Sequence, residues 1–233
     1  MQLSKRLLAC CQYVQPGDRV ADIGCDHGYL SLHLLQNHIA SSVIAADINE
    51  GPLRSAMVNA EKFGVIDNIR FYLSDGVQSI PREFDRLICA GMGGDTMISI
   101  LEAAPWLRNS QYAMVLQCQS KTAMLRQYLA DKGWQIQDET VVRDGRFLYT
   151  VMSVIWQKDS YQLTAGQLHF SPALLNHPDE DTAEYFQRQL FSLRRANLGR
   201  GEHADPQMLA AQAELEALEA QNTWLKELTQ WQP

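Results

Sequence analysis

The 233-residue sequence lacks the features that direct a chain into a membrane or an oxidising compartment. No apolar run approaches the roughly 18 residues that a membrane-spanning helix needs. The apolar stretch near the N-terminus, Leu7–Cys11, is short and has the spacing of an amphipathic helix, which is not typical of a signal peptide. The 5 cysteines are odd in number and include no Cys-x-x-Cys pair, which argues against disulfides and structural zinc. We therefore expect a cytoplasmic protein with no membrane contact.

The sequence also lacks metal-ligand spacing and an excess of positive charge. Its 6 histidines form no His-Glu-x-x-His or similar pattern, so no metal is expected. The formal net charge of −7 argues by itself against non-specific binding of nucleic acid. One segment departs from this balance, because residues 186–200 contain four arginines and no acid. That segment is either a basic strip for a polyanion or an ordinary solvated helix face.

What is present is an alternation of strand-like and helix-like segments as far as about residue 156. The expected strands cover 19–23, 42–47, 69–73, 85–90 and 113–116, and the expected helices cover 29–36, 52–63, 96–103 and 122–132. Such alternation predicts a parallel, doubly wound sheet. Two further strand-like runs, 136–143 and 146–156, flank Asp144-Gly145, which is a hairpin signal. An α/β sheet that ends in such a hairpin is the plan of the Rossmann-like class I methyltransferases, by analogy of fold.

The character of the sequence changes after residue 158. Residues 162–178 read as a loop, and two runs with apolar residues at 3,4 spacing follow at 183–197 and 208–225. This spacing predicts an antiparallel, coiled-coil-like α-helical hairpin, with Asn197 and Asn222 in its seam. The expected division is a Rossmann-like domain over 1–160 and a helical-hairpin domain over 161–233. Whether the hairpin only packs on itself or also binds a partner stays open.

The turn after the first expected strand has the composition of a cofactor-binding loop. Asp22-Ile23-Gly24-Cys25-Asp26-His27-Gly28 lies where Rossmann-like folds hold a nucleotide. In the dinucleotide pattern Gly-x-Gly-x-x-Gly the second glycine is here Asp26, and a carboxylate at that point would repel a pyrophosphate. S-adenosylmethionine (SAM) has no phosphate and carries a sulfonium and an ammonium cation, which suit Asp22 and Asp26. The loop therefore favours SAM over NAD.

Acids and glycines recur at the ends of the later strands. Asp47 can accept hydrogen bonds from both ribose hydroxyls, and Asp75 can accept one from the adenine amino group. The run Gly91–Gly94, which includes Met92, lets the backbone approach the methyl group that is transferred. The expected cofactor-binding residues are Asp22, Gly24, Cys25, Asp26, His27, Asp47, Ile48, Asp75, Gly76, Gly91, Met92 and Gly93.

Three motifs together resemble the TrmK family of bacterial SAM-dependent tRNA (adenine-22, N1) methyltransferases. They are the runs Asp22–Leu30, Ala90–Gly94 and Asp144–Tyr149. The resemblance covers the whole chain, and it implies a Rossmann-like domain followed by a helical coiled-coil domain, SAM as cofactor and tRNA as substrate. The sequence departs from the family after the fifth strand, where the Gln-Pro-Asn of the family is replaced by Gln117-Cys118-Gln119. The resemblance implies that this segment faces the target base.

The expected chemistry is an in-line methyl transfer to adenine N1, with much of the catalysis supplied by positioning. Because N1 becomes positively charged, a nearby carboxylate would stabilise it or accept a proton from the amino group. Asp26 is the expected catalytic residue, and Asp95 is the second candidate. The expected substrate contacts are Gln117, Cys118, Gln119, Arg188, Arg194 and Arg195. Two alternatives remain, a SAM methyltransferase for a protein or small molecule and a non-catalytic SAM- or RNA-binding scaffold, and the oligomeric state is left open.

Overall fold

The structure, a computed structural model, describes residues 3–231 of the chain. In this part, seven strands form one sheet in the order β3-β2-β1-β4-β5-β7-β6. The strands are β1 (Asp18–Ile23), β2 (Ala40–Asp47), β3 (Ile69–Leu73), β4 (Arg86–Gly93), β5 (Ala113–Ser120), β6 (Trp134–Asp144) and β7 (Phe147–Trp156). Strands β1 to β5 are parallel, and β7 runs antiparallel between β5 and β6. The predicted doubly wound sheet and its closing hairpin are confirmed.

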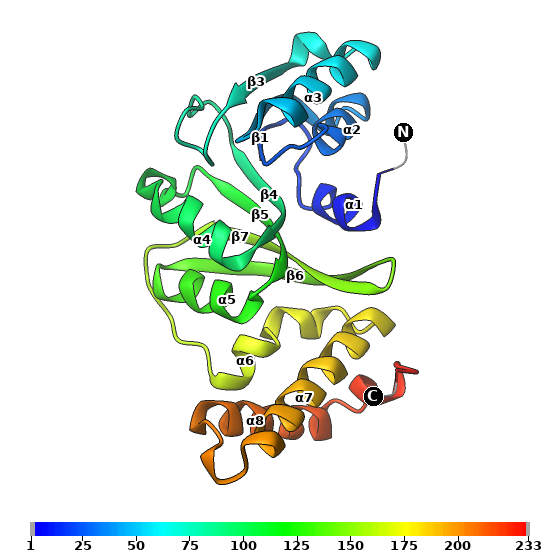
Figure 1. The fold of residues 1–233 in the computed structure, drawn as a ribbon, viewed down its shortest axis with the longest axis vertical. Coiled ribbons are helices and arrows are strands. Elements are labelled where there is room, and N and C mark those ends of the chain that lie inside the picture. Colours follow the sequence, from blue (N-terminus) through cyan, green and yellow to red (C-terminus); the bar gives the residue numbers. More distant parts are fainter. Residues whose placement is uncertain (1–2, 232–233) are drawn as a thin grey trace.

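Helices cover both faces of this sheet (Figure 1). One face carries α1 (Lys5–Cys11), α2 (Tyr29–Gln36) and α3 (Glu50–Lys62), and the other carries α4 (Gly94–Glu102) and α5 (Thr122–Asp131). Short 3-10 turns follow α3 at Ile66–Asn68 and α4 at Pro105–Leu107. Successive side chains of a strand point to opposite faces, so Met114 of β5 belongs to one core and Val115 to the other. Both cores are apolar, which fixes the register of the central strands.

Strands β4 and β5 are longer than the sequence predicts. The sequence predicts a strand that ends at residue 90, but β4 continues through Gly93, and α4 begins directly at Gly94. Strand β5 continues beside it, and Met92 pairs with Cys118 and Gly93 with Ser120, with a register shift between these two pairs. A register shift lies between Ala90 and Met92, where Gly91 has a φ of 83°. Glycine accommodates this bulge without strain, and the paired strands therefore run past the point where apolar residues end.

The segment predicted as a loop at 162–178 contains two short helical elements. They are α6 (Ala165–His169) and a 3-10 helix at Pro172–Asn176. Thr164 and Gln167 form a capping box at the start of α6, and the Ser171 hydroxyl accepts from the Ala173 N–H. Both elements are too short to show the regular spacing of apolar residues that identifies a helix. Only their capping residues mark them in the sequence.

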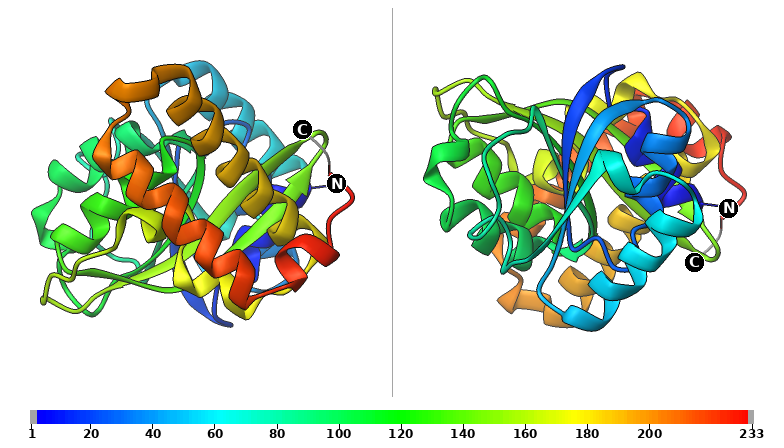
Figure 2. Two further views of the ribbon diagram at one scale, coloured as in Figure 1. Left: turned by 90° about the horizontal axis from the view of Figure 1, so that it is seen from below. Right: turned by 90° about the horizontal axis from the view of Figure 1, so that it is seen from above.

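The tail contains two longer helices, α7 (Glu180–Arg200) and α8 (Pro206–Gln221), which lie side by side and antiparallel (Figure 2). A 3-10 turn at Gly201–His203 lies between them, and α9 (Trp224–Glu227) follows. Near the connecting turn, Asn197 donates to the Gln212 side chain at 2.8 Å. Near the other end, Gln187 donates to Glu219 at 2.7 Å. These pairs fix the two helices in antiparallel register.

The second apolar run does not form one helix to residue 225. Helix α8 ends at Gln221, and Asn222 is its C-terminal cap, with its side-chain amide donating to the Leu218 carbonyl at 3.0 Å. The expectation that Asn222 lies in the helix seam is therefore wrong. A side chain that takes a terminal carbonyl of its own helix ends that helix rather than pairing across it.

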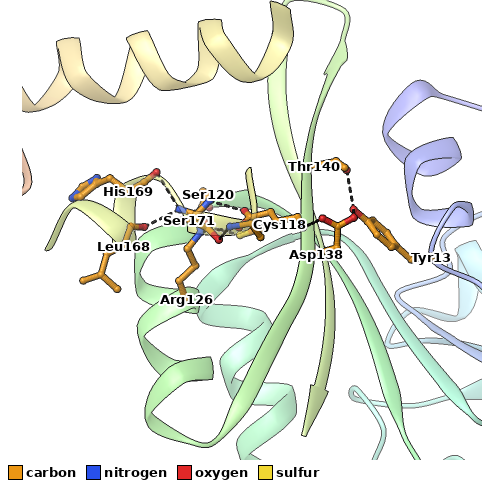
Figure 3. Close-up of polar contacts among 11 residues, drawn as sticks. Tyr13, Cys118, Ser120, Arg126, Asp138, Thr140, Leu168, His169 and Ser171 are labelled. Atoms are coloured by element: carbon orange, nitrogen blue, oxygen red, sulfur yellow. Dashed lines mark hydrogen bonds and ion pairs between the residues drawn. The ribbon is translucent and has the colours of Figure 1, made fainter. Parts of the chain in front are cut away.

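The tail packs on the sheet through a shared apolar core and a buried ion pair. Val141 of β6 belongs to the same apolar cluster as Phe186 and Leu190 of α7. Arg126 of α5 is fully buried, its Nη2 lies 2.6 Å from Glu139 Oε1, and its Nη1 donates to the carbonyls of Leu168 and His169 in α6 (Figure 3). No helix in residues 3–231 has the length and apolarity to cross a bilayer.

Candidate functional site

The carboxyl ends of β1, β2 and β4 border a crevice at the point where the strand order reverses. Two adjoining cavities of about 550 and 330 Å³ lie there and share five lining residues, which are Gly24, Asp47, Asn49, Ala90 and Gly91. Parallel α/β sheets bind ligands at this position. The larger cavity extends over the ends of β2 and β3 to α4, and the smaller one extends under the loop between β1 and α2 and reaches α1.

Eleven of the twelve expected cofactor-binding residues line these cavities. The larger cavity contains Gly24, Asp47, Ile48, Asp75, Gly76, Gly91 and Met92, and the smaller one adds Asp22, Cys25, Asp26 and His27. Gly93 lines neither cavity, because β4 carries it away from the crevice toward Ser120 of β5. These residues are separated by up to seventy positions in the sequence. They lie together because the parallel strands that carry them end at the same edge of the sheet.

Asp47 lies where the two cavities meet, and it is held by backbone donors. Its Oδ2 accepts from the Asp26 N–H at 3.1 Å, and its Oδ1 accepts from the Asn49 N–H at 2.9 Å. The residue is 8% exposed, so its orientation is fixed. Each carboxylate oxygen can accept more than one hydrogen bond. Asp47 therefore retains acceptor capacity on both oxygens toward the cavities.

The far end of the larger cavity combines one acid with an apolar wall. Asp75 is exposed there, and its Oδ2 accepts from Gln78 Nε2 at 3.3 Å. Ile48 follows Asp47 and leaves 62% of its surface exposed. Ile100 of α4 and Ala103, the C-terminal cap of that helix, form part of the lining. An acceptor beside exposed apolar surface suits a flat, partly apolar ring with an amino group.

Asp22 is the buried acid of the smaller cavity. Only 2% of its surface is exposed, and Ser31 Oγ donates to its Oδ2 at 2.6 Å. Burial raises the pKa of Asp22 from its ordinary 3.8 to about 6, against the opposing effect of the Ser31 hydrogen bond. A cation placed beside Asp22 would favour the ionised carboxylate. Such a cation would bind more tightly when a larger fraction of Asp22 is ionised.

Gly24 separates the two acids of the loop, and the structure requires glycine there. Its φ is 71°, and a Cβ at this position would lie 2.3 Å from Cε of Met92. Met92 of the β4 bulge therefore packs directly against the β1 loop. This contact couples the two glycine-containing segments that the sequence motifs single out.

Arg6 also lies at the candidate site, although its position is not predicted from the sequence. It lies on α1 and lines the smaller cavity, where its Nη1 donates to Oε1 of Gln117 at 3.0 Å. Its Nε lies 3.8 Å from Oδ2 of Asp144 at the hairpin tip. A Cβ on Gly91 would approach Nη1 to 3.2 Å. An arginine on an amphipathic N-terminal helix resembles a solvated charge, and only the packing of α1 against β4 and β5 reveals its position.

The two candidate catalytic acids have different surroundings. Asp26 lines the smaller cavity, has a φ of 51°, and holds its Oδ1 at 3.6 Å from Nε2 of His27. Asp95 lines neither cavity, and its Oδ2 lies 2.6 Å from Nζ of Lys121. The hydrogen bond from Lys121 holds the pKa of Asp95 below its ordinary value. Asp26 is therefore the better-placed acid, because it lines the cavity and Asp95 does not.

The segment Gln117-Cys118-Gln119 does not face the crevice as a unit. Gln117 is fully buried and bonded to Arg6, and its Nε2 donates to the Cys118 carbonyl at 3.2 Å. Cys118 is buried in the core, and its Sγ contacts the Ser120 carbonyl at 3.0 Å. Only Gln119 is exposed, next to Gly91. These residues belong to β5 and do not form a loop after it. Their side chains therefore alternate between the two faces of the sheet.

The arginines of α7 are partly neutralised by acids that the sequence places elsewhere. Arg188 Nη2 lies 2.5 Å from Oε1 of Glu184, one helical turn earlier. Arg194 Nε lies 2.9 Å from Oε1 of Glu216 on α8. Arg195 is exposed. Residues 186–200 therefore present less free positive charge than their sequence indicates, because antiparallel packing places Glu216 of α8 beside Arg194.

Neither a metal centre nor a disulfide stands out in the crevice. Within residues 3–231, no group of three or more His, Cys, Asp or Glu side chains could hold a metal ion. The 5 cysteines are buried and unbonded.

Residues 3–152 match a family model described as a methyltransferase domain. A tRNA (adenine(22)-N(1))-methyltransferase of Bacillus subtilis is 34% identical over 174 residues, which span 72% of this chain and 73% of that protein. The chain belongs to the TrmK family. The TrmK likeness extends to the tail, because the crystal structure of the B. subtilis m1A22 tRNA methyltransferase TrmK superposes with a TM-score of 0.76 at 29% identity, over 97% of this chain and 98% of that one.

A second solved relative was determined with S-adenosyl-L-methionine bound. Streptococcus pneumoniae Sp1610, a putative tRNA (m1A22) methyltransferase in complex with S-adenosyl-L-methionine, superposes with a TM-score of 0.77 at 26% identity. The match covers 97% of this chain and 99% of that chain. The Rossmann-like fold and the helical tail are therefore common to these TrmK proteins.

Proposed function

We propose that this chain is a SAM-dependent methyltransferase that methylates N1 of adenine 22 in tRNA, as the name of its B. subtilis relative states for that protein. The observation that carries the proposal is the crevice at the strand ends, with Asp22, Asp47 and Asp75 placed in succession along it. Family membership supplies the substrate, and the crevice supplies a fitting site for the cofactor.

The acids and Arg6 match the groups of SAM one by one. Asp75 and the apolar wall suit adenine, and Asp47 suits the ribose hydroxyls. Asp22 suits the ammonium group. Among the described residues that line the two cavities, Arg6 is the only lysine or arginine, so it is the residue that suits the methionine carboxylate. When bound, SAM supplies an electrophilic methyl group on its sulfonium.

The residues of the chain then have three tasks. Gly91 and Met92 bring backbone close to the place of transfer, where the bulge of β4 faces the crevice. Asp26 presents a carboxylate that stabilises positive charge on the adenine ring or takes the proton that its amino group loses. Asp95 is the less favourable alternative because Lys121 stabilises its ionised form. Positioning of the base against the methyl group supplies much of the remaining rate.

The tail is proposed as a second domain that contacts tRNA. In this proposal α7 and α8 act as a coiled-coil-like arm over 161–233, beside a SAM-binding domain over 1–160, and the protein works in the cytoplasm. The exposed Arg195 and the buried Asn197, which pairs across to α8, support it. Gln119, Arg188 and Arg194 are further proposed substrate contacts, the two arginines after exchange of their acidic partners for phosphate.

The proposal is tested by incubating the protein with labelled SAM and two tRNA transcripts that differ only at position 22. The transcript with adenine should gain one methyl group, recovered as 1-methyladenosine after digestion, and the transcript with guanine should gain none. Binding of SAM by calorimetry is measured in parallel. SAM binding without methylation of either transcript would contradict the proposed reaction, and equal labelling of both would contradict the proposed position.

A further inference from the structure

A third cavity, of about 340 Å³, lies beside the cofactor crevice and shares no residue with it. It is bordered by the start of α5, the end of α6 and the first half of α7, and its floor is formed by β5 and β7. Its polar lining includes Ser120, Lys121, Thr122, Arg126, Thr150 and His169. Figure 3 shows Ser120, Arg126 and His169 gathered at this place.

The lining of this cavity is basic, although the protein is acidic. Lys121, Arg126 and His169 line it, and no Asp or Glu occurs among the described lining residues. Lys121 pairs with Asp95 and Arg126 with Glu139, and both acids lie outside the lining. Burial lowers the pKa of His169, so this side chain adds a donor rather than a charge near neutral pH. In a chain with a formal net charge of −7, a cavity without an acid in its wall favours an anionic ligand.

The N-terminal end of α5 opens into the same cavity. This helix has 10 residues, and Ser120 to Ala123 line the cavity. Its cap residue, Lys121, makes no side-chain cap hydrogen bond. The first N–H groups of an α-helix have no partner within the helix, and the helix dipole adds positive potential there. A phosphate oxygen is a suitable acceptor for such groups.

An independent observation comes from the floor of the cavity. Thr150 is 1% exposed, and its Oγ1 has no hydrogen-bond partner among the described residues. Thr150 of β7 pairs with Cys118 of β5, and both residues line the cavity, so the two side chains share this face of the sheet. A buried hydroxyl without a hydrogen-bond partner lowers the stability of the fold. A ligand oxygen in the cavity would accept the missing hydrogen bond.

The cavity borders the place of methyl transfer. Gly93 of the β4 glycine segment is so close that a Cβ on it would lie 3.1 Å from Ser120 Oγ. Gln119, the one exposed residue of the altered segment, lines the cavity and also approaches Gly91 of the cofactor crevice. A nucleotide whose base enters the crevice therefore has its backbone within reach of this cavity.

We propose that this cavity binds a backbone phosphate of the tRNA next to the nucleotide that is methylated. The inference rests on the proposed function for the identity of the polyanion. Lys121 and the first N–H groups of α5 contact the phosphate at the rim, and Thr150 donates to it from the floor. Holding one phosphate here fixes the position of the target nucleotide relative to the β4 glycine segment.

The test compares two buried threonines that have the same defect. Thr182 is 0% exposed and also has an unpartnered Oγ1, but it lines none of the three cavities. Thr150→Val and Thr182→Val each replace a buried hydroxyl by a methyl group, so their thermal unfolding should change alike. Affinity for an adenine-22 tRNA transcript, measured by filter binding across a salt series, should fall roughly tenfold for Thr150→Val and stay unchanged for Thr182→Val. SAM affinity should be unchanged in both.

Lys121→Gln adds the electrostatic part of the test. Its log–log salt slope should be smaller by about one than that of the wild type, as expected for one lost phosphate contact. Unchanged tRNA affinity in Thr150→Val would overturn the proposal, and so would an effect confined to Lys121→Gln, because the phosphate would then lie outside the cavity. Methylation is scored separately: tRNA binding that depends on Thr150, without formation of 1-methyladenosine, would contradict the proposed reaction but support the phosphate site.

Discussion

Arg6 of α1 donates a hydrogen bond from Nη1 to Oε1 of the fully buried Gln117 at the end of β5, at 3.0 Å. The contact ties the N-terminal helix to the carboxyl edge of the sheet, 111 positions away in the chain. It holds a guanidinium at the smaller cavity while leaving other N–H donors of Arg6 for a ligand. Helix α1 is thus part of the candidate site as well as of the core.

Replacement of Arg6 by alanine should weaken SAM binding at least tenfold, because a charge-assisted hydrogen bond contributes about 1.5–3 kcal/mol. Calorimetry with SAM and with an analogue lacking the carboxylate separates the causes. The wild type should prefer SAM, and Arg6→Ala should bind the two alike. Arg54→Ala is the control, because Arg54 lies on α3 with its side chain 79% exposed. A variant that still prefers SAM would exclude Arg6 as the carboxylate partner.

Asp47→Ala should lower SAM affinity by well over tenfold, since two charge-assisted hydrogen bonds to the ribose would be lost, each worth roughly 1.5–3 kcal/mol. The variant should also unfold at a somewhat lower temperature, because the Asp26 and Asn49 N–H groups lose their acceptor. Calorimetry and thermal unfolding are measured on the same sample. A folded variant with unchanged SAM affinity would show that Asp47 only orders the loop.

Asp26→Asn keeps the shape of the side chain and removes its charge. If Asp26 stabilises the developing charge on adenine, single-turnover methylation should slow by roughly a hundredfold or more. SAM affinity should change less than the rate. Asp95→Asn should have the smaller effect, because Lys121 already neutralises Asp95. Equal losses of rate and SAM affinity in Asp26→Asn would instead make it a cofactor ligand only.

The raised pKa of Asp22, about 6 in the free protein, predicts a pH dependence of SAM binding. The SAM ammonium favours the ionised carboxylate, so affinity should rise as the pH rises through about 6 and then level off. Asp22→Asn should bind weakly with a flat profile over this range. Calorimetry between roughly pH 5 and 8 checks this. A wild-type profile as flat as that of the variant would rule out Asp22 as the titrating group.

The same pKa has an opposite consequence for stability in the absence of SAM. Between the ordinary pKa of 3.8 and about 6, the Asp22 carboxyl binds more protons in the folded protein than in the unfolded chain. The Asp22 contribution to the free energy of unfolding therefore falls as the pH rises through that interval. Asp22→Asn should remove this part of the pH dependence in denaturant unfolding.

The arginines of α7 are tested by tRNA binding. If they contact tRNA, Arg195→Ala should reduce the log–log salt slope of tRNA binding by about one. Glu216→Gln should strengthen tRNA binding, because it releases Arg194 from its ion pair. Thermal stability should change little, since exposed pairs contribute little to folding. Identical salt series for both variants and the wild type would show that this helix face does not touch RNA.

The sequence was sufficient to predict the sheet and the acids along its edge. Asp47 and Asp75 could be placed because Asp47 ends one short apolar strand and Asp75 follows the next, and parallel strands end at one edge. Arg6 could not be placed, because nothing in a helical apolar pattern says which strand ends the helix will cover. The extent of β4 and β5 was also not predictable, since a bulge at Gly91 lets pairing continue where the apolar pattern stops.

The tail was predictable in its helices but not in its contacts. Spacing of 3 and 4 identified α7 and α8, yet the partners of Arg188 and Arg194 depend on the antiparallel register. Asn222 shows the limit most clearly, because an asparagine in an apolar period is compatible with both a seam and a cap. In the structure the Asn222 side chain donates to the Leu218 carbonyl of its own helix, which makes it a cap.

The buried contact of Arg126 with Glu139 and the carbonyls of α6 makes the methyltransferase sheet and the tail mutually dependent. A chain cut near residue 160 would keep the arginine and the glutamate but lose the two carbonyls, and Val141 would lose its apolar neighbours. We therefore expect the two parts to fold together rather than independently. In relatives that lose or exchange the tail, the positions equivalent to 126, 139 and 141 should change together with it.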